Sequence, residues 1–470
     1  MKKKLIAALC TLAVSVGLLS GCSQGAESDA GRETSAQEET AGGAAEENTQ
    51  KEEVVVTMPA TSEPESGFDP AFGWGAGEHV HEPLIQSTLT VTTQDLQMDK
   101  DLAADYSVSE DGMTWTVTIR DDVKFTDGEP LTARDVAFTY NNCKEKSSVN
   151  DFTMLEEAVA VDDTTVEFHM TRPYSIWPYT MAIVGIVPEH AYDENYGQNP
   201  IGSGRYIMKQ WDKGQQVIFE ENPDYYGEEP KIKKLTVLFM EEDAALAAAM
   251  AGEVDVAHTA ASYSDQSVEG YELFSVQTVD NRGFNLPCST PQEKDGVTYG
   301  NEFTSDVNVR RAINIGIDRQ EMIDNVLNGY GTAAYSVCDK MPWYNPESEV
   351  EYDPEEAKKI LEDAGWKKGT DGIRKKDGVR AEFTLMFSNG DSVRQALAAS
   401  SLEESYDLWQ KAQWDGTTGI TQEGDIPWIW LCNIDHLYFV RDGLQIAEQK
   451  IHPHGHGWSI VNNVDQWSWE

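Results

Sequence analysis

The sequence predicts an α/β fold that is divided into two or more lobes. Segments that alternate like β-strands and segments with the period of amphipathic helices follow one another along the body of the chain, as they do in α/β proteins. The body that starts at residue 53 is too long for one hydrophobic core of usual size, so several lobes are expected. No internal repeat is evident.

The first 22 residues have the layout of a secretory signal peptide. Lys2–Lys4 form a basic start, and the apolar stretch LIAALCTLAVSVGLL is too short to remain as a membrane span. The ending Leu-Ser-Gly-Cys resembles a bacterial lipobox, in which cleavage before Cys22 leaves that cysteine as a lipidated N-terminus; the alternative is an ordinary signal peptide with an incidental cysteine. We therefore predict an extracytoplasmic protein that is anchored by lipid to the outer face of the cytoplasmic membrane.

Residues 23–52 are predicted to be a disordered acidic tether. They are rich in Glu, Ala, Gly and Ser and contain no aromatic residue, so they cannot bury enough apolar surface to offset the entropy of ordering. The whole chain has a formal charge of −45. This charge excludes nucleic acid as a partner, because nucleic-acid binding needs basic surface, and it argues against adhesion to anionic lipid.

The cysteines do not indicate a metal cluster. Cys10 leaves with the signal peptide, and the four cysteines of the body have no Cys-x-x-Cys spacing. One or two disulfides are compatible with an extracytoplasmic location, but their pairing cannot be derived from the sequence. The four are Cys143, Cys288, Cys338 and Cys432.

A strand pair and a helix are predicted near the start of the body. The turn signal Glu110-Asp111-Gly112 precedes the alternating β-formers Thr114–Ile119, and a second turn signal follows at Thr126-Asp127-Gly128, so a hairpin or meander is expected. Next, LTARDVAFTYNNC begins a helix with Thr132 as the N-cap and with an apolar stripe that includes Val136 and Tyr140.

Two further helices are predicted in the second half. In YDPEEAKKILEDAGW, Asp353 is the expected cap, Pro354 occupies the first turn, Ile360 belongs to the apolar stripe, and Gly365 ends the helix. The segment VRRAINIGIDRQEMIDNVLNGYG is predicted to be one helix that Gly329 ends.

These segments, in this order, resemble the family-5 extracytoplasmic solute-binding proteins, the peptide- and nickel-binding subunits of ATP-driven importers. The resemblance extends over nearly all of residues 53–397. It is carried by ordered blocks: LAADYSVSEDGMTWTVTIRDDVKFTDGEPLTARDVAFTY, NPIGSGRY, ENPDYYGEEPKIKKL, AMAGEVDVA, DVNVRRAINIGIDRQEMI and YDPEEAKKILEDAGW.

The resemblance implies a periplasmic-binding-protein-like fold of type II, with two lobes, a hinge made by two crossings of the chain, and a ligand cleft between the lobes. It implies a monomer without enzymatic activity or cofactor that captures short peptides and delivers them to an ABC permease; a nickel-binding subunit is the alternative. The expected parts are the lobe I core (53–88, 199–277 and 450–470), the lobe I extension (89–198) and lobe II (278–449).

The sequence departs from the family pattern near Ser400. After SNGDSVRQALAAS, Ser400-Ser401-Leu402 passes directly into a block that resembles a much later part of the family. An internal piece of lobe II is therefore predicted to be missing, either through a deletion or in a member with a reduced second lobe; we favour the deletion. The stretch that supplies the amine-binding aspartate or the nickel-pocket histidine in the family has no counterpart here.

Several residues are candidates for ligand contact through their position in the family blocks. Trp74 offers a flat surface for stacking, although it and His79 also suit packing and helix capping. Arg282 suits a carboxylate, although an ion pair within the protein is an equally good interpretation. The candidates are Trp74, Glu78, His79, Trp177, Arg282 and Asn285.

Two other interpretations are less favoured. In IHPHGHGW the imidazoles of His452, His454 and His456 would face one side of an extended segment, but spacing alone is weak support for a metal site, and we interpret the run as architecture. A metallohydrolase built on Glu78, His79 and His81 lacks a His-Glu-x-x-His motif, and the sequence has no nucleophile elbow or phosphate loop. A non-binding cell-surface protein is the remaining alternative.

Overall fold

The computed structural model of the protein describes residues 51–73, 82–147, 149–336, 339–340, 344, 346–385, 428–451 and 457–470. The predicted signal peptide with Cys22, almost all of the predicted tether and the predicted join near Ser401 lie outside the described residues. Within these ranges, none of the helices has both the length and the apolar character that crossing a bilayer requires.

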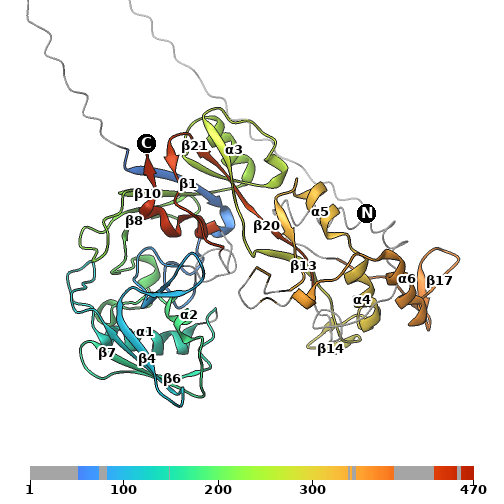
Figure 1. Cartoon of the computed structure of the whole chain (residues 1–470), viewed down its shortest axis with the longest axis horizontal. Helices are drawn as coiled ribbons and strands as arrows, with labels where there is room; N and C mark the ends of the chain where they lie inside the picture. The colour runs from blue at the N-terminus through green and yellow to red at the C-terminus, as the bar shows by residue number, and fades with distance from the viewer. Residues whose placement is uncertain are drawn as a thin grey trace, which may run out of the picture. The chain divides into compact units, whose positions relative to one another are not determined.

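A seven-stranded sheet contains strands from both ends of the described chain (Figure 1). Its central strand β1 reads EVVVTMP; the β-branched side chains of Val54 and Val56 on one face and of Thr57 on the other are fully buried, as expected for a strand covered on both faces. β1 pairs in parallel with two neighbours, and the outer pairs are antiparallel. In spatial order the strands are β12 (Tyr271–Val276), β21 (His436–Arg441), β11 (Val256–Thr259), β1 (Glu53–Pro59), β10 (Lys234–Met240), β9 (Gln216–Glu221) and β8 (Tyr206–Asp212).

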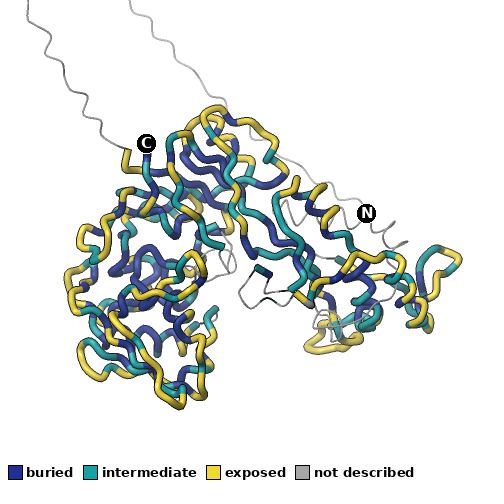
Figure 2. The backbone as a smooth tube through the Cα atoms, viewed as in Figure 1, coloured by how far each residue is buried: buried dark blue, intermediate teal, exposed yellow. Residues whose placement is uncertain are grey.

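The C-terminal segment completes the core of this sheet. The 3-10 segment η6 (Gly457–Gln466) brings Trp458 against Phe68, with ring centroids 5.8 Å apart and the rings perpendicular, and Trp467 is buried beside it. Figure 2 shows the centre of the sheet in the colour of buried residues. Strand β21 belongs to this sheet although its residues fall in the segment predicted for lobe II; the division of the chain into lobes stays a prediction.

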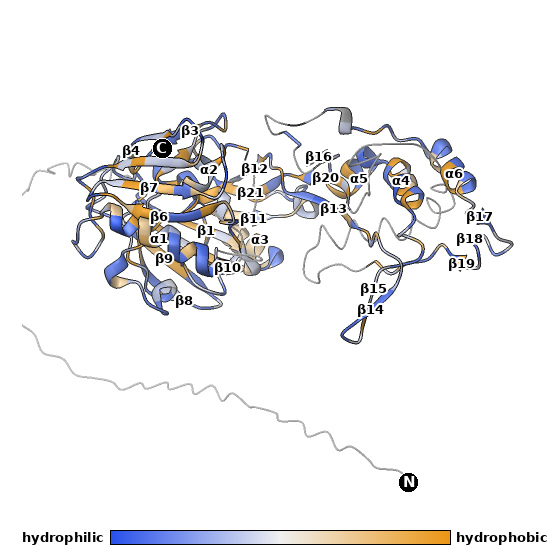
Figure 3. Ribbon diagram, turned by 90° about the horizontal axis from the view of Figure 1, so that it is seen from below, coloured by the Kyte–Doolittle hydropathy of each residue, from blue (hydrophilic) through white to orange (hydrophobic). Residues whose placement is uncertain are grey.

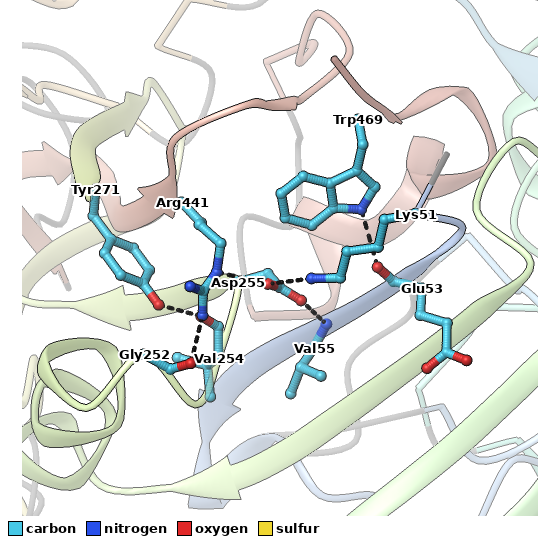
Figure 4. Close-up of polar contacts among 9 residues, drawn as sticks. All are labelled: Lys51, Glu53, Val55, Gly252, Val254, Asp255, Tyr271, Arg441 and Trp469. Atoms are coloured by element: carbon cyan, nitrogen blue, oxygen red, sulfur yellow. Dashed lines mark hydrogen bonds and ion pairs between the residues drawn. The ribbon is translucent and has the colours of Figure 1, made fainter. Parts of the chain in front are cut away.

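A closed polar network fixes the first strand (Figure 4). The buried carboxylate of Asp255 accepts hydrogen bonds from Lys51 Nζ (2.8 Å), Arg441 Nε (2.8 Å) and the backbone N–H of Val55 (2.9 Å). Arg441 also donates to two backbone carbonyls, and the Lys51 ammonium lies over the Trp469 ring. Lys51 is thus bonded to the sheet although it falls in the segment predicted as the tether; the bounds of the tether stay a prediction.

A four-stranded antiparallel sheet and helix α1 (Ala133–Lys146) form two further layers of the fold. The predicted strand Thr114–Ile119 is confirmed as β5, and Gly128 occupies the predicted second turn with φ +94°. Thr132 is the N-cap residue of α1, and the Asp135 carboxylate at the third helical position accepts both its backbone N–H and its Oγ1 at 2.9 Å, as in a capping box. In spatial order the strands are β4 (Ala103–Val108), β5 (Thr114–Ile119), β7 (Thr165–Met170) and β6 (Leu155–Ala160).

A three-stranded antiparallel sheet carries the helices of the second half. The segment predicted as one helix is broken into α4 (Val307–Gly316) and α5 (Arg319–Val326), because Asp318 leaves the helical conformation and caps α5 by accepting from Glu321 N–H at 2.9 Å. This is a correction to the sequence prediction. The strands in spatial order are β13 (Asn281–Asn285), β20 (Trp428–Ile434) and β16 (Gly331–Ala333).

Helix α6 (Pro354–Asp363) confirms the prediction made for its segment. Asp353 accepts from the backbone N–H groups of Glu355 (2.9 Å) and Glu356 (2.8 Å), and Gly365 follows the helix with φ +92°, a conformation that favours glycine. Apolar and polar residues alternate around α6 (Figure 3), and Ile360 on its apolar stripe is buried.

The remaining elements are short. They are β2 (Thr90–Thr92), β3 (Met98–Lys100), β14 (Gln292–Lys294), β15 (Val297–Tyr299), β17 (Lys367–Lys368), β18 (Arg374–Lys376), β19 (Val379–Arg380), β22 (Leu444–Gln445), β23 (Ser468–Trp469), α2 (Trp177–Met181), α3 (Glu242–Met250), η1 (Ala60–Ser62), η2 (Glu189–Ala191), η3 (Tyr196–Gln198), η4 (Ala261–Tyr263) and η5 (Pro346–Ser348).

The cysteines that the structure describes are free thiols. Cys143 and Cys432 are buried and Cys288 is half-buried. Cys338 lies outside the described residues, so a disulfide that involves it is not addressed. The possibility of disulfides among the other three is therefore not realised in this structure.

Candidate ligand-binding site at the chain crossings

The chain passes twice between the seven-stranded and the three-stranded sheet. It leaves the first sheet at the end of β12 and enters the second at β13, and it returns at Asp435, the single residue between β20 and β21. Backbone hydrogen bonds join the two passages, since Ile434 N–H donates to the carbonyl of Asp280 at 3.0 Å. These are the two crossings that the family resemblance implied.

Charged side chains cluster at these crossings. Asp280 is bonded to Arg282 Nη1, and its second carboxylate oxygen lies 3.1 Å from His436 Nε2. Thr278 Oγ1 donates to the carbonyl of Ile434 at 2.7 Å and accepts the Asp280 N–H at 2.8 Å. The exposed fractions of Asp280 and Arg282 are 8% and 11%, so this ion pair is largely shielded from water.

A second group of polar atoms has no partner among the described residues. Asn433 stands opposite Asn281 on one side and Thr332 on the other, which places the three side chains in one row across the sheet. Thr332 Oγ1, Asp435 Oδ1 and Lys340 Nζ are buried and unpaired within the described part of the chain, whereas the Asn433 side chain interacts with the Asp339 carboxylate. Buried polar groups are usually hydrogen-bonded, so these atoms are candidates to bond water or a solute.

Burial shifts the pKa values of the titratable side chains in this group. Burial lowers the pKa of Lys340 and raises the pKa of Asp435, while the opposite charge of each partly counteracts the shift in the other. Burial also raises the pKa of Asp339, although two backbone N–H bonds favour its ionised form. Such perturbed groups gather preferentially at functional sites.

A crevice of about 500 Å³ extends the polar surface. Its lining includes Gln86, Asp101, Tyr225 and Gln466. Two ion pairs also lie in this lining: Arg205 with Asp465, and Lys450 with Glu82. A much smaller hollow at the crossings, lined by Thr278 and His436, shares Lys450 with the crevice. The crevice therefore ends next to the first crossing.

The sequence-predicted site residues fall into three groups. Trp74, Glu78, His79, His452, His454 and His456 lie outside the described residues. Trp177 is fully buried in an aromatic core with Tyr140 and Phe168, so packing is the role that its surroundings support. Arg282 and Asn285 both lie on β13; Arg282 forms the ion pair with Asp280 and Asn285 is exposed.

Sequence reasoning missed the residues that the crossings bring together. Asp280, Asp435, His436 and Lys340 come from three distant segments, and one signal pointed to two of them: Asp435 and His436 interrupt WIWLCNIDHLYFV, an otherwise apolar run. Across the described ranges, no group of three or more His, Cys, Asp or Glu residues is arranged to hold a metal ion.

Comparison with known proteins identifies the family. The model described as "bacterial extracellular solute-binding proteins, family 5 Middle" matches residues 97–405, which is more than half of the chain. The chain belongs to this family. Family 5 comprises extracytoplasmic substrate-binding proteins of ABC transporters, and the mixed α/β fold described above is the fold of this family.

Individual family-5 proteins are similar over most of the chain. Protein XP55 of Streptomyces lividans is 35% identical over 368 residues, which are 74% of this chain and 64% of that protein. The oligopeptide-binding protein AppA of Bacillus subtilis is 28% identical and covers 69% of this chain and 62% of its own length. The chain thus spans less than two thirds of the length of these curated relatives.

A solved family-5 structure confirms the fold. The crystal structure of NikZ from Campylobacter jejuni in complex with Ni(L-His) superposes with a TM-score of 0.74 at 21% identity. The superposition covers 89% of this chain and 99% of that chain.

Proposed function

We propose that this family-5 protein is the solute-binding lipoprotein of an ABC importer and that it captures short peptides for a membrane permease. The proposal depends chiefly on one observation: three buried polar atoms beside the two chain crossings, Thr332 Oγ1, Lys340 Nζ and Asp435 Oδ1, have no hydrogen-bond partner among the described residues. A solute held at the crossings would complete their hydrogen bonds, and closure of a hinge would enclose it. The oligopeptide-binding relative AppA supports peptides as the solute.

Binding without chemistry is part of the proposal. Burial raises the pKa of the Cys432 thiol to about 12, so this cysteine is not a ready nucleophile. Burial lowers the pKa of His258 to about 4 and keeps its imidazole away from solvent. Neither group has the exposure and the partner that nucleophilic or general-base catalysis needs.

The peptide proposal is tested on the purified mature chain. Dialanine, trialanine and tetraalanine are added separately, and thermal unfolding is followed; a solute at about 100 times its Kd adds about 2.7 kcal/mol to the free energy of unfolding. Nickel with L-histidine is the comparison, because NikZ binds Ni(L-His). A shift with nickel–histidine alone would replace peptides by a nickel chelate as the solute. Cleavage of the peptides would contradict binding without chemistry.

The location is tested through Cys22. We propose that lipid on Cys22 and the tether hold the body as a monomer at the outer face of the cytoplasmic membrane. In membrane fractions of cells that express the full chain, the parent protein should sediment with the membrane, and Cys22→Ala should appear in the soluble extracytoplasmic fraction. Cys143→Ala, a buried cysteine of the body, is the control and should remain with the membrane. Equal sedimentation of C22A and the parent would contradict lipid anchoring.

A further inference from the structure

The crevice beside the first chain crossing is a polar cavity that the peptide proposal leaves unused. Its volume of about 500 Å³ lies within the range of pockets that enclose small molecules. Most of the uncharged side chains in its lining end in an amide or a hydroxyl group, and such groups both donate and accept hydrogen bonds. They include Gln86, Ser87, Thr88, Gln449, Ser459 and Asn462.

The most shielded charged side chains of this crevice already have partners. Lys450 is bonded to Glu82, and Arg205 is bonded to Asp465. The exposed fractions of these four side chains run from 12% to 19%, so both ion pairs are largely shielded from water. A charged ligand would have to break a shielded pair and leave one of its charges without a partner, which is costly.

The two other charged residues of the described lining are also satisfied. Asp101 accepts a hydrogen bond from Tyr226 Oη at 2.8 Å, and Lys100 Nζ lies 2.7 Å from a carboxylate oxygen of Asp105. The described lining therefore presents no unpaired charge to an ionic ligand. It also holds as many anionic as cationic residues, namely Glu82, Asp101 and Asp465 against Lys100, Arg205 and Lys450.

One buried oxygen in this lining needs a hydrogen-bond donor. Gln86 is 2% exposed, and its Nε2 donates to the Phe68 carbonyl and to Tyr196 Oη, both at 3.1 Å. The orientation of the amide is fixed, because the Tyr196 hydroxyl donates its own proton to the Ile201 carbonyl (2.7 Å) and so can only accept from Gln86. Gln86 Oε1 is buried and has no hydrogen-bond partner among the described residues.

A second buried oxygen in the lining, Ser459 Oγ, also lacks a partner within the described ranges. Ser459 belongs to η6 near the C-terminus, whereas Gln86 precedes β2, so the fold brings the two residues to one cavity from distant segments. An amide oxygen only accepts hydrogen bonds, and a serine hydroxyl both donates and accepts them. A ligand with several alcohol groups satisfies both, because each alcohol can donate to Gln86 Oε1 or exchange a hydrogen bond with Ser459 Oγ.

We infer that the crevice is a second ligand site of this protein, which takes a neutral polyhydroxy compound of the size of a mono- or disaccharide. The inference goes beyond the proposed capture of peptides and does not rest on it. Hydroxyl groups of the ligand bond to the amide and hydroxyl side chains of the lining, and the ion pairs of the crevice stay intact.

The test titrates neutral and charged sugars into the purified mature chain. Glucose, maltose and myo-inositol are the neutral probes, and glucuronate and protonated glucosamine carry one charge on the glucose framework. Calorimetry should show saturable binding of at least one neutral probe. The charged analogues should bind on the order of 10-fold more weakly than the best neutral probe, because no unpaired charge of the described lining compensates theirs.

Two variants locate the site, and two matched variants serve as controls. Ser459→Ala should weaken binding on the order of 10-fold and leave thermal unfolding unchanged, because Ser459 Oγ has no partner to lose among the described residues. Gln86→Met should weaken binding by a similar factor, and its thermal unfolding is measured because it also loses two internal hydrogen bonds. Ser289→Ala and Gln292→Met, at exposed residues outside the crevice lining, should bind as the parent does.

The outcomes separate this inference from the proposed function. If a neutral sugar binds the parent and both crevice variants weaken that binding, the crevice is a polyhydroxy site, even when no alanine peptide binds. If no neutral sugar binds, if a charged analogue binds more tightly, or if a folded crevice variant binds as the parent does, the inference is wrong. Competition between the sugar and trialanine would contradict a separate ligand site, while peptide binding would stand.

Discussion

The Asp255 network and the pair of Lys340 with Asp435, which we call the split pair, are two buried polar groups of opposite character. Asp255 accepts three hydrogen bonds from two cations and a backbone N–H, and its residue is 2% exposed (Figure 4). In the split pair, Lys340 Nζ and Asp435 Oδ1 have no partner in the described part of the chain. A closed network is complete in the free protein and serves stability, whereas an open one is completed only by something that binds.

Removing Asp255 should have the largest effect on stability. Asp255→Ala leaves Arg441, Lys51 and the Val55 N–H without their acceptor, and breaking a buried charged network of this kind costs about 3 to 5 kcal/mol. Urea unfolding measures the loss. Asp442→Asn, an exposed neighbour of Arg441, is the control and should change the free energy of unfolding by less than about 0.5 kcal/mol. If D255A lowered the free energy of unfolding by less than about 1 kcal/mol, the Asp255 network would not be the stabilising group that this comparison requires.

His258 offers a second way to disturb the seven-stranded sheet, through pH. Its Nδ1 lies 2.7 Å from Thr57 Oγ1, and burial lowers its pKa to about 4 from an ordinary value of 6.5. Below pH 6.5 the unfolded chain therefore binds a proton at the His258 imidazole, whereas the folded chain does not bind it until the pH approaches 4. Stability from this group is fully present above pH 6.5 and is lost as the pH falls to 4, by about 3 kcal/mol in total.

The His258 prediction is checked by the pH dependence of urea unfolding. The parent should lose about 3 kcal/mol relative to His258→Gln between pH 6.5 and 4, whatever the stability of the variant at neutral pH. The difference in slope is the readout, because other groups titrate equally in both proteins. Parallel profiles for the two proteins would show that His258 accepts its proton in the folded state.

The N-cap of helix α6 is a reference for how much one local interaction stabilises the second half of the chain. Asp353 accepts two backbone N–H bonds at the start of α6, so Asp353→Ala should lower the free energy of unfolding by about 1 kcal/mol. Asp353→Asn retains an acceptor and should lose less. Peptide affinity should be unchanged in both variants. If either variant weakened peptide binding as much as Asp435→Asn at the chain crossings does, the effect of D435N would reflect a general loss of stability and not the loss of a ligand contact.

The split pair itself should contribute least to the stability of the free protein. The double variant Lys340→Met with Asp435→Asn removes both unpaired charges, so its free energy of unfolding should stay within about 1 kcal/mol of the parent or rise. Urea unfolding without ligand measures it. A loss as large as that of D255A would mean that the two charges already stabilise each other.

Local features were predictable from the sequence, and long-range ones were not. Asp353 and Thr132 cap their helices as predicted, because a capping residue acts within one turn of its own position. The single helix predicted through Asp318 was wrong, since the apolar pattern continues across the break and only the residue type of Asp318 signalled a new cap. Composition and periodicity alone predicted only an α/β fold. The sequence blocks that resemble the family were needed to predict the periplasmic-binding-protein-like type.

The site was the least predictable part. The candidate site depends on Lys340 and Asp435 approaching each other in the folded chain, and no local sequence pattern predicts that approach. Arg282 was selected through its family block, and it lies at the crossings, but paired with Asp280. Trp177 had the right residue type for stacking and is fully buried, because periodicity cannot distinguish an aromatic core from an aromatic pocket wall.

One calorimetric experiment compares the closed and the open group directly. Trialanine is titrated into the parent, Asp255→Asn and Asp435→Asn under conditions in which circular dichroism shows all three to be folded. D255N should bind with the affinity of the parent despite its lower stability, and D435N should bind on the order of 30-fold more weakly despite its parental stability. Equal affinity for D435N and the parent, or a loss of binding in D255N alone, would contradict a binding site at the chain crossings.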